Sequence, residues 1–156
     1  MTIRYDNRVA VVTGAGSGLG RSHALFLASR GAKVVVNDLG GAVDGSGAST
    51  SAGEKVVAEI IAAGGEAVAN ADSVATPEGA ASIIQCAIDN YGQVDILINN
   101  AGNLRDKSFA KLQPEDFDAV VDVHLSGSAY CTLAAWPHMK DAGYGRIVMT
   151  TSSAGL

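Results

Sequence analysis

Residues 9–21 read VAVVTGAGSGLGR and contain an apolar run, a glycine-rich turn and the beginning of a second apolar pattern. The run predicts a buried strand, and the apolar positions that recur at helical spacing after the turn predict a helix. Gly14, Gly18 and Gly20 let the backbone turn sharply and leave room for a bulky ligand to approach it. Because the first helical turn directs free N–H groups and a partial positive charge toward that space, we predict a pyrophosphate-binding site.

The turn departs from the commonest dinucleotide fingerprint, G-x-G-x-x-G, because Leu19 stands where that pattern needs its last glycine. It reads TGxxxGxG from Thr13 to Gly20 instead. A purely structural connection between a strand and a helix is the alternative interpretation of this turn when it is taken alone. Features further along the chain decide between the two.

The composition is typical of a single domain with a buried sheet. The chain has 156 residues, of which 47% are hydrophobic, with 19 glycines and 3 prolines; this is enough for one core. A net charge of −5 argues against nucleic acid or an anionic membrane surface as partner. No apolar run approaches the roughly 20 residues of a membrane-spanning helix. The first residues lack the pattern of a signal peptide, so we expect a cytoplasmic protein.

The two cysteines, Cys86 and Cys131, lie far apart within predicted helices. Such cysteines in a cytoplasmic protein are usually reduced core residues. The sequence contains no C-x-x-C, H-E-x-x-H or aspartate-rich loop, so we predict no metal site.

Asp38 stands at the carboxyl end of a second predicted strand, residues 32–38, which contains three consecutive valines. In a doubly wound sheet, an acidic residue at this place accepts hydrogen bonds from the adenosine ribose. Its charge would repel a 2′-phosphate, which favours NAD over NADP. The alternative is a solvated carboxylate at the start of a loop. Residues 39–51 form that loop, which we interpret as an insertion at the rim of the cofactor site rather than a linker.

Three further strands are predicted at residues 66–72, 94–98 and 145–150, each preceded by a helix. The last of these helices begins at Pro114 and extends to about Lys140, and Pro137 is expected to kink or end it. Five strands that alternate with helices predict a doubly wound, Rossmann-like parallel sheet. Asn99-Asn100-Ala101-Gly102 directly follows the fourth strand, at the edge where ligands of such sheets bind, although asparagine-rich turns also occur for conformational reasons alone.

The order of these motifs resembles that of the short-chain dehydrogenase/reductase family. The resemblance rests on the glycine turn, Asp38, Asp72 after the third strand, the Asn99–Gly102 turn and Ser152 after the fifth strand. Five stretches resemble one branch more closely, the (3R)-hydroxyacyl-CoA dehydrogenase units of multifunctional β-oxidation enzymes. They read NDLGG from 37, LRDKSF from 104, VHL from 123, AAWP from 134 and YGRIVMT from 144.

The resemblance implies transfer of a hydride between NAD(H) and a secondary alcohol or ketone, with a 3-hydroxyacyl or 3-ketoacyl thioester such as an acyl-CoA among the substrates. Ser152 matches the serine that polarises the substrate oxygen, and Ser153 is its rival. The cofactor-binding residues that the resemblance implies are Gly14, Ser17, Gly18, Leu19, Gly20, Asp38, Asp72, Ser73, Asn100, Ala101 and Gly102.

His124 stands where most of the family has an asparagine that helps to hold a water of the proton relay. We therefore assign His124 to the catalytic set. The alternative is that it is a histidine packed in the core with its ring nitrogens satisfied.

The family's Tyr-x-x-x-Lys motif follows the serine, and none of Tyr5, Tyr91, Tyr130 and Tyr144 has a lysine four positions on. We expect a single dinucleotide-binding domain over residues 1–156, truncated before a sixth strand and a substrate lid. The alternative is a catalytically incomplete binding module or an assembly subunit. Family members pair through the long helix and the helix that follows it, so the resemblance implies a homodimer or homotetramer.

Overall fold

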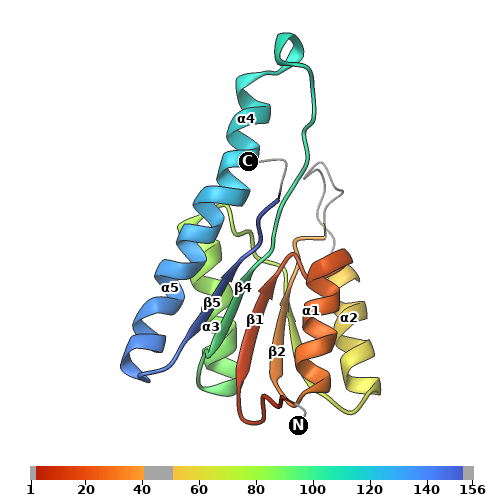
Figure 1. Cartoon of the computed structure of the whole chain (residues 1–156), viewed down its shortest axis with the longest axis vertical. Coiled ribbons are helices and arrows are strands. Elements are labelled where there is room, and N and C mark those ends of the chain that lie inside the picture. The colour runs from red at the N-terminus through yellow and green to blue at the C-terminus, as the bar shows by residue number, and fades with distance from the viewer. Residues whose placement is uncertain (1–2, 41–50, 153–156) are drawn as a thin grey trace.

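Short segments rich in valine and isoleucine form a five-stranded parallel sheet in the order β3-β2-β1-β4-β5 (Figure 1). The computed structural model describes residues 3–40 and 51–152. The strands are β1 (Val9–Thr13), β2 (Lys33–Asn37), β3 (Glu66–Asn70), β4 (Ile96–Asn99) and β5 (Arg146–Met149). All lie within the predicted segments or one residue beyond them. The predicted loop insertion falls mostly on residues 41–50, outside the described residues.

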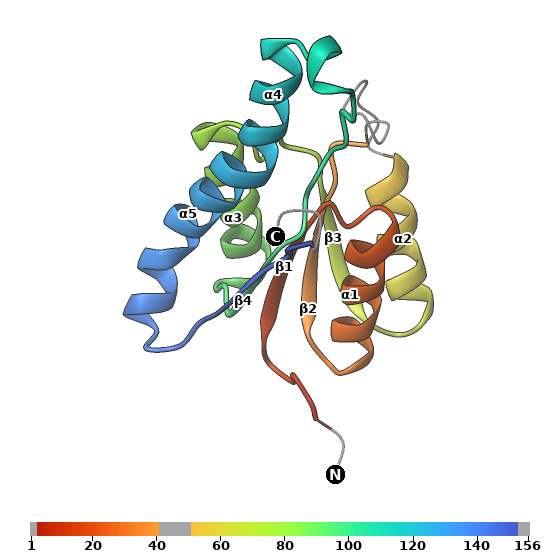
Figure 2. The same ribbon diagram turned by 45° about the horizontal axis from the view of Figure 1, so that its top comes forward.

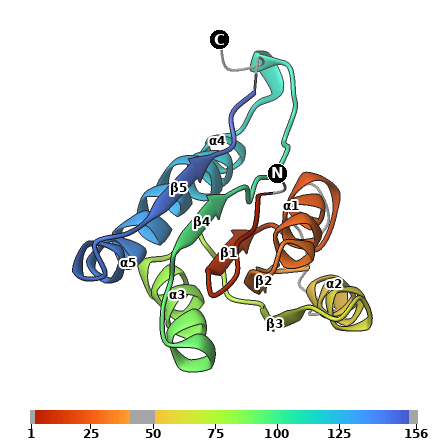
Figure 3. The same cartoon turned by 60° about the horizontal axis from the view of Figure 1, so that its bottom comes forward.

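Helices cover both faces of the sheet (Figure 3). On one face lie α1 (Gly18–Ser29) and α2 (Ser51–Ala62), and on the other lie α3 (Pro77–Tyr91) and α5 (Gly127–Asp141). Side chains alternate along β1, so that Ala10 and Val12 join the core under α1 and α2, while Val9 and Val11 join the core under α3 and α5. A strand buried on both faces explains the continuous apolar runs and confirms the predicted doubly wound α/β fold.

The chain between β4 and β5 rises beyond the carboxyl end of the sheet and returns as a nearly continuous helical rod (Figures 1 and 2). It contains a 3₁₀ turn, η1 (Phe109–Lys111), then α4 (Pro114–Val121), a π-helical turn, η2 (Asp122–Ser126), and α5. The π-helical turn was not predicted.

Pro137 does not end the helix, contrary to one of the two outcomes expected from the sequence. α5 continues for four residues beyond it, to Asp141. Proline removes one N–H donor from the helix. The buried side chains of Ala135 and Met139 lie on either side of Pro137 and hold this part of α5 against the sheet.

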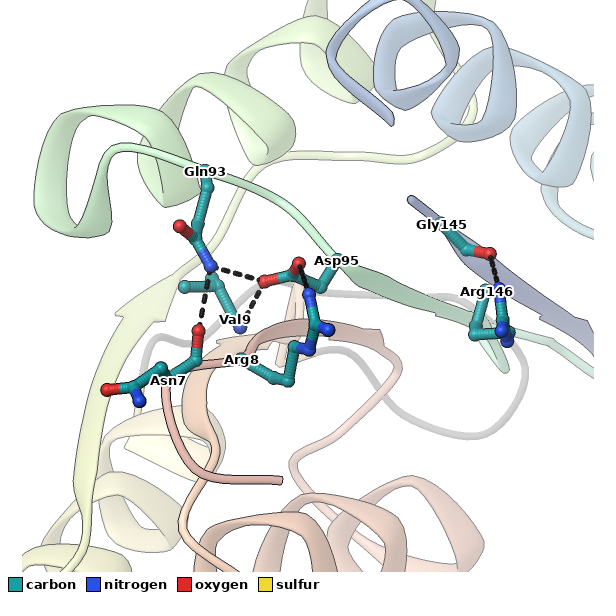
Figure 4. A network of polar contacts seen from close by, with 7 residues as sticks. All are labelled: Asn7, Arg8, Val9, Gln93, Asp95, Gly145 and Arg146. Atoms are coloured by element: carbon teal, nitrogen blue, oxygen red, sulfur yellow. Dashed lines mark hydrogen bonds and ion pairs between the residues drawn. The ribbon is translucent and has the colours of Figure 1, made fainter. Parts of the chain in front are cut away.

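A polar cluster ties the amino ends of the central strands together (Figure 4). The Asp95 carboxylate, 5% exposed, accepts hydrogen bonds from the Arg8 guanidinium at 2.8 Å, the Val9 N–H at 2.8 Å and the Gln93 amide at 2.6 Å. The Arg8 guanidinium lies 3.6 Å from the centre of the Tyr144 ring, just before β5. At this end of the sheet, hydrogen bonds to a charged carboxylate therefore hold the strands together. At the opposite end, the chain leaves the strands in turns.

Candidate functional site

The chain crosses from one side of the sheet to the other between β1 and β4, which are neighbours in the sheet but not in the sequence. In open α/β sheets, ligands bind beside the carboxyl ends of the strands at such a crossing point. The glycine turn follows β1, Asp38 follows β2 and the Asn99–Gly102 turn begins at the end of β4. The fold therefore places these predicted residues along one edge of the sheet.

Two of the glycines are required by close backbone contacts. Gly14 has a φ of +61°, and a Cβ there would lie 2.8 Å from Ala101 Cα. A Cβ on Gly20 would lie 2.1 Å from the Gly14 carbonyl oxygen. The turn is consequently folded onto itself and onto the Ala101 backbone, and only glycine fits at these two positions.

The middle of the turn is open instead. A Cβ on Gly18, whose φ is +52°, would meet no described atom within 4 Å apart from its chain neighbours and the backbone of its own helix. Ser17 is the N-cap of α1, yet its side chain makes no capping bond within the described part of the chain, and Leu19 is 66% exposed. The first turn of α1 is thus exposed at residues 17–19, and the unpaired N–H groups of a helix start suit the pyrophosphate of a dinucleotide.

Asp38 is tied to the glycine turn by hydrogen bonds from the backbone. Its Oδ2 accepts the Gly16 N–H at 2.7 Å, and its Oδ1 accepts the Gly40 N–H at 2.7 Å. The half-buried carboxylate is thus not simply a solvated group at the start of a loop. Each carboxylate oxygen has a second lone pair, so Asp38 can hold the turn and still accept bonds from ribose hydroxyls.

Thr13 links the turns that follow β1 and β4, although it was not predicted from the sequence as a site residue. Its buried Oγ1 accepts the N–H groups of Asn100 and Ala101, both at 3.0 Å. The Asn100 amide in turn donates to the carbonyls of Thr13 at 3.0 Å and Gly14 at 3.1 Å. The sequence signal for this role was the hydroxyl side chain directly before Gly14.

Asp72 closes a polar network at the end of β3. Its Oδ2 accepts from the Asn70 amide at 2.8 Å and from the Ser82 hydroxyl at 2.6 Å. The buried Asn37 side chain, also missed from the sequence, donates to the Asp72 carbonyl at 2.9 Å. Ser73 Oγ accepts the Ala75 N–H at 3.2 Å. Asp72 and Ser73 therefore shape the loop between β3 and α3, and their contact with a cofactor stays a prediction.

His124 lies on the π-helical turn, and it is exposed rather than packed in the core. Its Nε2 lies 3.0 Å from the Asn103 backbone nitrogen. The ring therefore contacts the chain just beyond Asn100, Ala101 and Gly102, which were predicted to bind the cofactor.

Ser152 follows β5 at the same edge of the sheet and is exposed. The Thr150 N–H donates to the Asn99 carbonyl at 3.0 Å, so the chain leaves β5 beside the end of β4. Ser153, the rival position, lies outside the described residues.

Two surface hollows lie at the opposite end of the sheet. Arg4, Lys33 and Glu66 line one, and Arg8, Asp95 and Tyr144 line the other, so neither contains a predicted site residue. Over residues 3–40 and 51–152, no set of three or more possible metal ligands comes together. The same residues contain no helix with the length and apolar character needed to span a membrane.

Comparison with known proteins gives consistent matches. A family model described as short chain dehydrogenase matches residues 8–156. The peroxisomal multifunctional enzyme type 2 of Drosophila melanogaster is 58% identical over 154 residues, which are 99% of this chain and 25% of that protein. The 3-oxoacyl-[acyl-carrier-protein] reductase of Synechocystis sp. is 42% identical over 149 residues, 96% of this chain and 57% of that protein.

Among solved structures, 7α-hydroxysteroid dehydrogenase complexed with NADH and 7-oxo glycochenodeoxycholic acid has a TM-score of 0.88 and 32% identity. The match covers 97% of this chain and 56% of that one. The chain thus spans between a quarter and somewhat more than half of the length of these proteins.

Proposed function

The chain belongs to the short-chain dehydrogenase family, and from this premise we propose that it provides the NAD-binding part of an oxidoreductase. The reaction is the transfer of a hydride between NAD(H) and the carbon of a secondary alcohol or ketone. The nicotinamide supplies the hydride chemistry when NAD(H) is bound, and the residues of the chain bind and orient it. The observation that carries the proposal is the Asp38 carboxylate held against an open glycine turn by the Gly16 N–H at 2.7 Å.

In this proposal, each turn at the carboxyl edge of the sheet binds a different part of the cofactor or the substrate. The N–H groups at the start of α1 hold the pyrophosphate, and Asp38 accepts the ribose hydroxyls. Asn100, Ala101 and Gly102 form the floor beside the second ribose. The Ser152 hydroxyl donates to the substrate oxygen, so that it stabilises negative charge that develops there without a covalent bond.

The substrate class that we propose is a 3-hydroxyacyl or 3-ketoacyl thioester, such as an acyl-CoA. Two relatives support a hydroxyl or keto carbon as the reacting centre. The Synechocystis protein is named a 3-oxoacyl-[acyl-carrier-protein] reductase, and the steroid dehydrogenase was solved with a 7-oxo compound.

A second copy of the chain is the partner that we propose. Apolar side chains are exposed along the rod formed by α4, η2 and α5, and a homodimer or homotetramer would cover them. The described free thiols Cys86 and Cys131 fit a reducing compartment such as the cytoplasm. The name of the Drosophila relative places that protein in the peroxisome.

The cofactor proposal is tested by titrating the chain with NADH and NADPH and following nucleotide fluorescence. NADH should bind more tightly, because the Asp38 carboxylate repels a 2′-phosphate. Asp38→Asn should weaken NADH binding about tenfold, as expected for a lost charged hydrogen bond, and should narrow the preference over NADPH. Asp89→Asn removes the same charge from the exposed side of α3 and is the matched control. Tighter binding of NADPH by the unchanged chain would exclude the proposed role of Asp38.

A further inference from the structure

A buried asparagine amide joins the end of β2 to the end of β3. The Asn37 side chain is 2% exposed, and its nitrogen donates to Asn70 Oδ1 at 2.8 Å and to the Asp72 carbonyl at 2.9 Å. Both atoms are acceptors, so the amide nitrogen of Asn37, rather than its oxygen, must face them. The orientation of the Asn37 amide is therefore fixed by its partners.

The same reasoning fixes the amide of Asn70. Its Oδ1 accepts from the Asn37 nitrogen at 2.8 Å and from the Asp72 N–H at 3.0 Å. The Asn70 nitrogen is consequently turned the other way, and it donates to Asp72 Oδ2 at 2.8 Å. The hydrogen bonds thus run in one direction, from Asn37 through Asn70 to the Asp72 carboxylate.

Ser82 brings a second donor to the same carboxylate oxygen from α3. Its hydroxyl donates to Asp72 Oδ2 at 2.6 Å. The first turn of α3 packs closely on the preceding loop, because a Cβ on Gly79 would clash with the Ser73 carbonyl oxygen. Two donors therefore hold Oδ2, whereas Asp72 Oδ1 accepts no bond from residues 3–40 and 51–152 and can accept one from a ligand.

The Asp72 carboxylate lies close to the place proposed for the adenosine ribose. The Asp38 N–H donates to the Asn70 carbonyl at 3.0 Å, and Asn37 pairs with Asn70 in the register of β2 and β3. Neighbouring strands are about 4.8 Å apart, so the two strand ends are separated by a single strand spacing. Because the base of a dinucleotide is joined directly to this ribose, the base comes within reach of the loop after β3.

A carboxylate at this place can distinguish two purine bases by their hydrogen bonding. An ionised carboxylate only accepts hydrogen bonds. Adenine carries an amino group, which donates, where hypoxanthine carries a carbonyl oxygen, which accepts. We propose that Asn70 and Ser82 are positioning residues that hold Asp72 with Oδ1 toward the base, so that the site selects adenine over hypoxanthine. The proposal rests on the proposed function in one respect, namely that Asp38 binds the ribose of NAD(H).

The first experiment compares the affinities for NADH and for reduced nicotinamide hypoxanthine dinucleotide, followed by nucleotide fluorescence. The unchanged chain should bind NADH about tenfold more tightly, because the hypoxanthine carbonyl loses a charged hydrogen bond and opposes the carboxylate. Ser82→Ala should reduce this preference about threefold, since Asn70 alone then holds Oδ2. Ser82→Thr keeps a hydroxyl and should restore the preference.

The matched control is Ser29→Ala, which removes a serine hydroxyl that donates to a helix carbonyl, that of Phe26, at the end of α1. It should leave the preference for NADH unchanged. If the bonds to Asp72 only shape the loop, Ser82→Ala should weaken the binding of both dinucleotides equally. An unchanged ratio of the two affinities in Ser82→Ala, or equal affinities in the unchanged chain, would therefore overturn the proposal.

The second experiment is designed to reverse the preference. Asp72→Asn replaces the carboxylate by an amide of the same shape, and only the amide oxygen can accept from Asn70 and Ser82. The amide nitrogen then takes the place of Oδ1 and offers a donor, which suits the carbonyl of hypoxanthine. The variant should bind the hypoxanthine dinucleotide about threefold more tightly than NADH.

The reversal should depend on Ser82. In the double variant Asp72→Asn and Ser82→Ala, one donor fewer orients the amide, so the preference for hypoxanthine should be smaller. A continued preference for NADH in Asp72→Asn, or the same reversal with and without the Ser82 hydroxyl, would refute the positioning role.

A readout without a cofactor separates this inference from the proposed function. In the nuclear magnetic resonance spectrum, the side-chain amide of Asn70 should move strongly in Asp72→Ala and stay in place in Ser29→Ala. An Asn70 amide that does not respond to Asp72→Ala would overturn the inference. If the unchanged chain binds neither dinucleotide, the proposed function fails, and the Asn70 resonance still tests whether Asp72 is held.

Discussion

The hydroxyl of Thr13 joins two loops that lie far apart in the sequence. Its Oγ1 accepts two N–H groups from the turn after β4 and lies 3.4 Å from the Ile98 carbonyl, to which it can donate. A hydroxyl can serve as one donor and two acceptors, so this buried group has its full set of partners. One residue therefore sets the distance between the glycine turn and the Asn99–Gly102 turn.

Cys131 provides a prediction at the scale of one residue. Burial raises the pKa of its thiol from an ordinary value near 9 to about 11, and its side chain is fully buried. The thiolate is the reactive form, so at pH 8 only about one molecule in a thousand can react. Iodoacetamide should leave Cys131 unmodified at pH 8 until guanidinium unfolds the chain, as measured by mass spectrometry of peptides.

Cys86 is the internal comparison for this experiment. It is half-buried, and burial, followed by the charges of Asp89 and Asp72, raises the pKa of its thiol as well. We expect slow labelling of Cys86 in the folded chain. Equal labelling of both thiols at pH 8 would contradict the buried position of Cys131.

The raised pKa of Cys131 also makes the stability of the chain depend on pH. The unfolded chain releases the Cys131 proton near pH 9 and the native chain retains it, so the free energy of unfolding should fall between pH 9 and 11.

Some residues could be predicted because their residue type and their place directly after a strand point to a role. Others were missed because their role depends on a partner that lies far away in the sequence. Gly14 and Asp38 follow their strands directly, so a pattern can identify them. Asn37 and Thr13 act through neighbours supplied by β3 and β4, and a single sequence does not show which strands are neighbours. The contact of His124 with Asn103 was hidden for the same reason.

At the scale of elements, all five strands could be predicted because each combines a short apolar run with a turn signal. The π-helical turn could not, since one extra residue in a helix leaves the periodic pattern almost unchanged. Pro137 did not end the helix as one of the two predicted outcomes required. Proline removes an N–H donor and adds a local clash, whereas the buried side chains of Ala135 and Met139 hold α5 in place.

Asp95 provides a prediction for the elements that meet at the amino end of the sheet. Asp95→Ala leaves the buried Val9 N–H and the half-buried Arg8 guanidinium without their acceptor. The free energy of unfolding in urea should fall by about 2–3 kcal/mol. Because this cluster lies at the end of the sheet opposite to the glycine turn, the NADH affinity of the folded molecules should stay unchanged.

The control is Asp6→Ala, which breaks the exposed ion pair with Arg4 and should leave the urea midpoint close to that of the unchanged chain. An Asp95→Ala variant within about 0.5 kcal/mol of the unchanged chain would show that the cluster does not hold the strands together.

At the scale of the whole molecule, the two ends of the sheet have separate tasks. The amino end carries a charged cluster around the buried Asp95 carboxylate, and the carboxyl end carries turns, of which the one after β1 leaves Ser17, Gly18 and Leu19 exposed. The crossing between β1 and β4 creates the second arrangement, because chain segments leave these neighbouring strands for opposite faces of the sheet. We therefore expect that stability and the proposed nucleotide binding can be changed independently.

The exposed apolar side chains along the helical rod predict how copies of the chain associate. Leu125 and Leu133 are each 69% exposed, Phe117 is 58% exposed and Trp136 is 57% exposed. We expect light scattering after size exclusion to show a dimer or tetramer, because association covers this apolar surface. The double variant Leu133→Glu and Trp136→Glu should be a monomer, since two carboxylates would have to be buried in the contact.

The control is Ile61→Glu, which changes a side chain with 57% exposure on the opposite face, at α2, and should leave the assembly intact. A monomeric unchanged chain, or equal dissociation by Ile61→Glu, would show that this rod is not the contact.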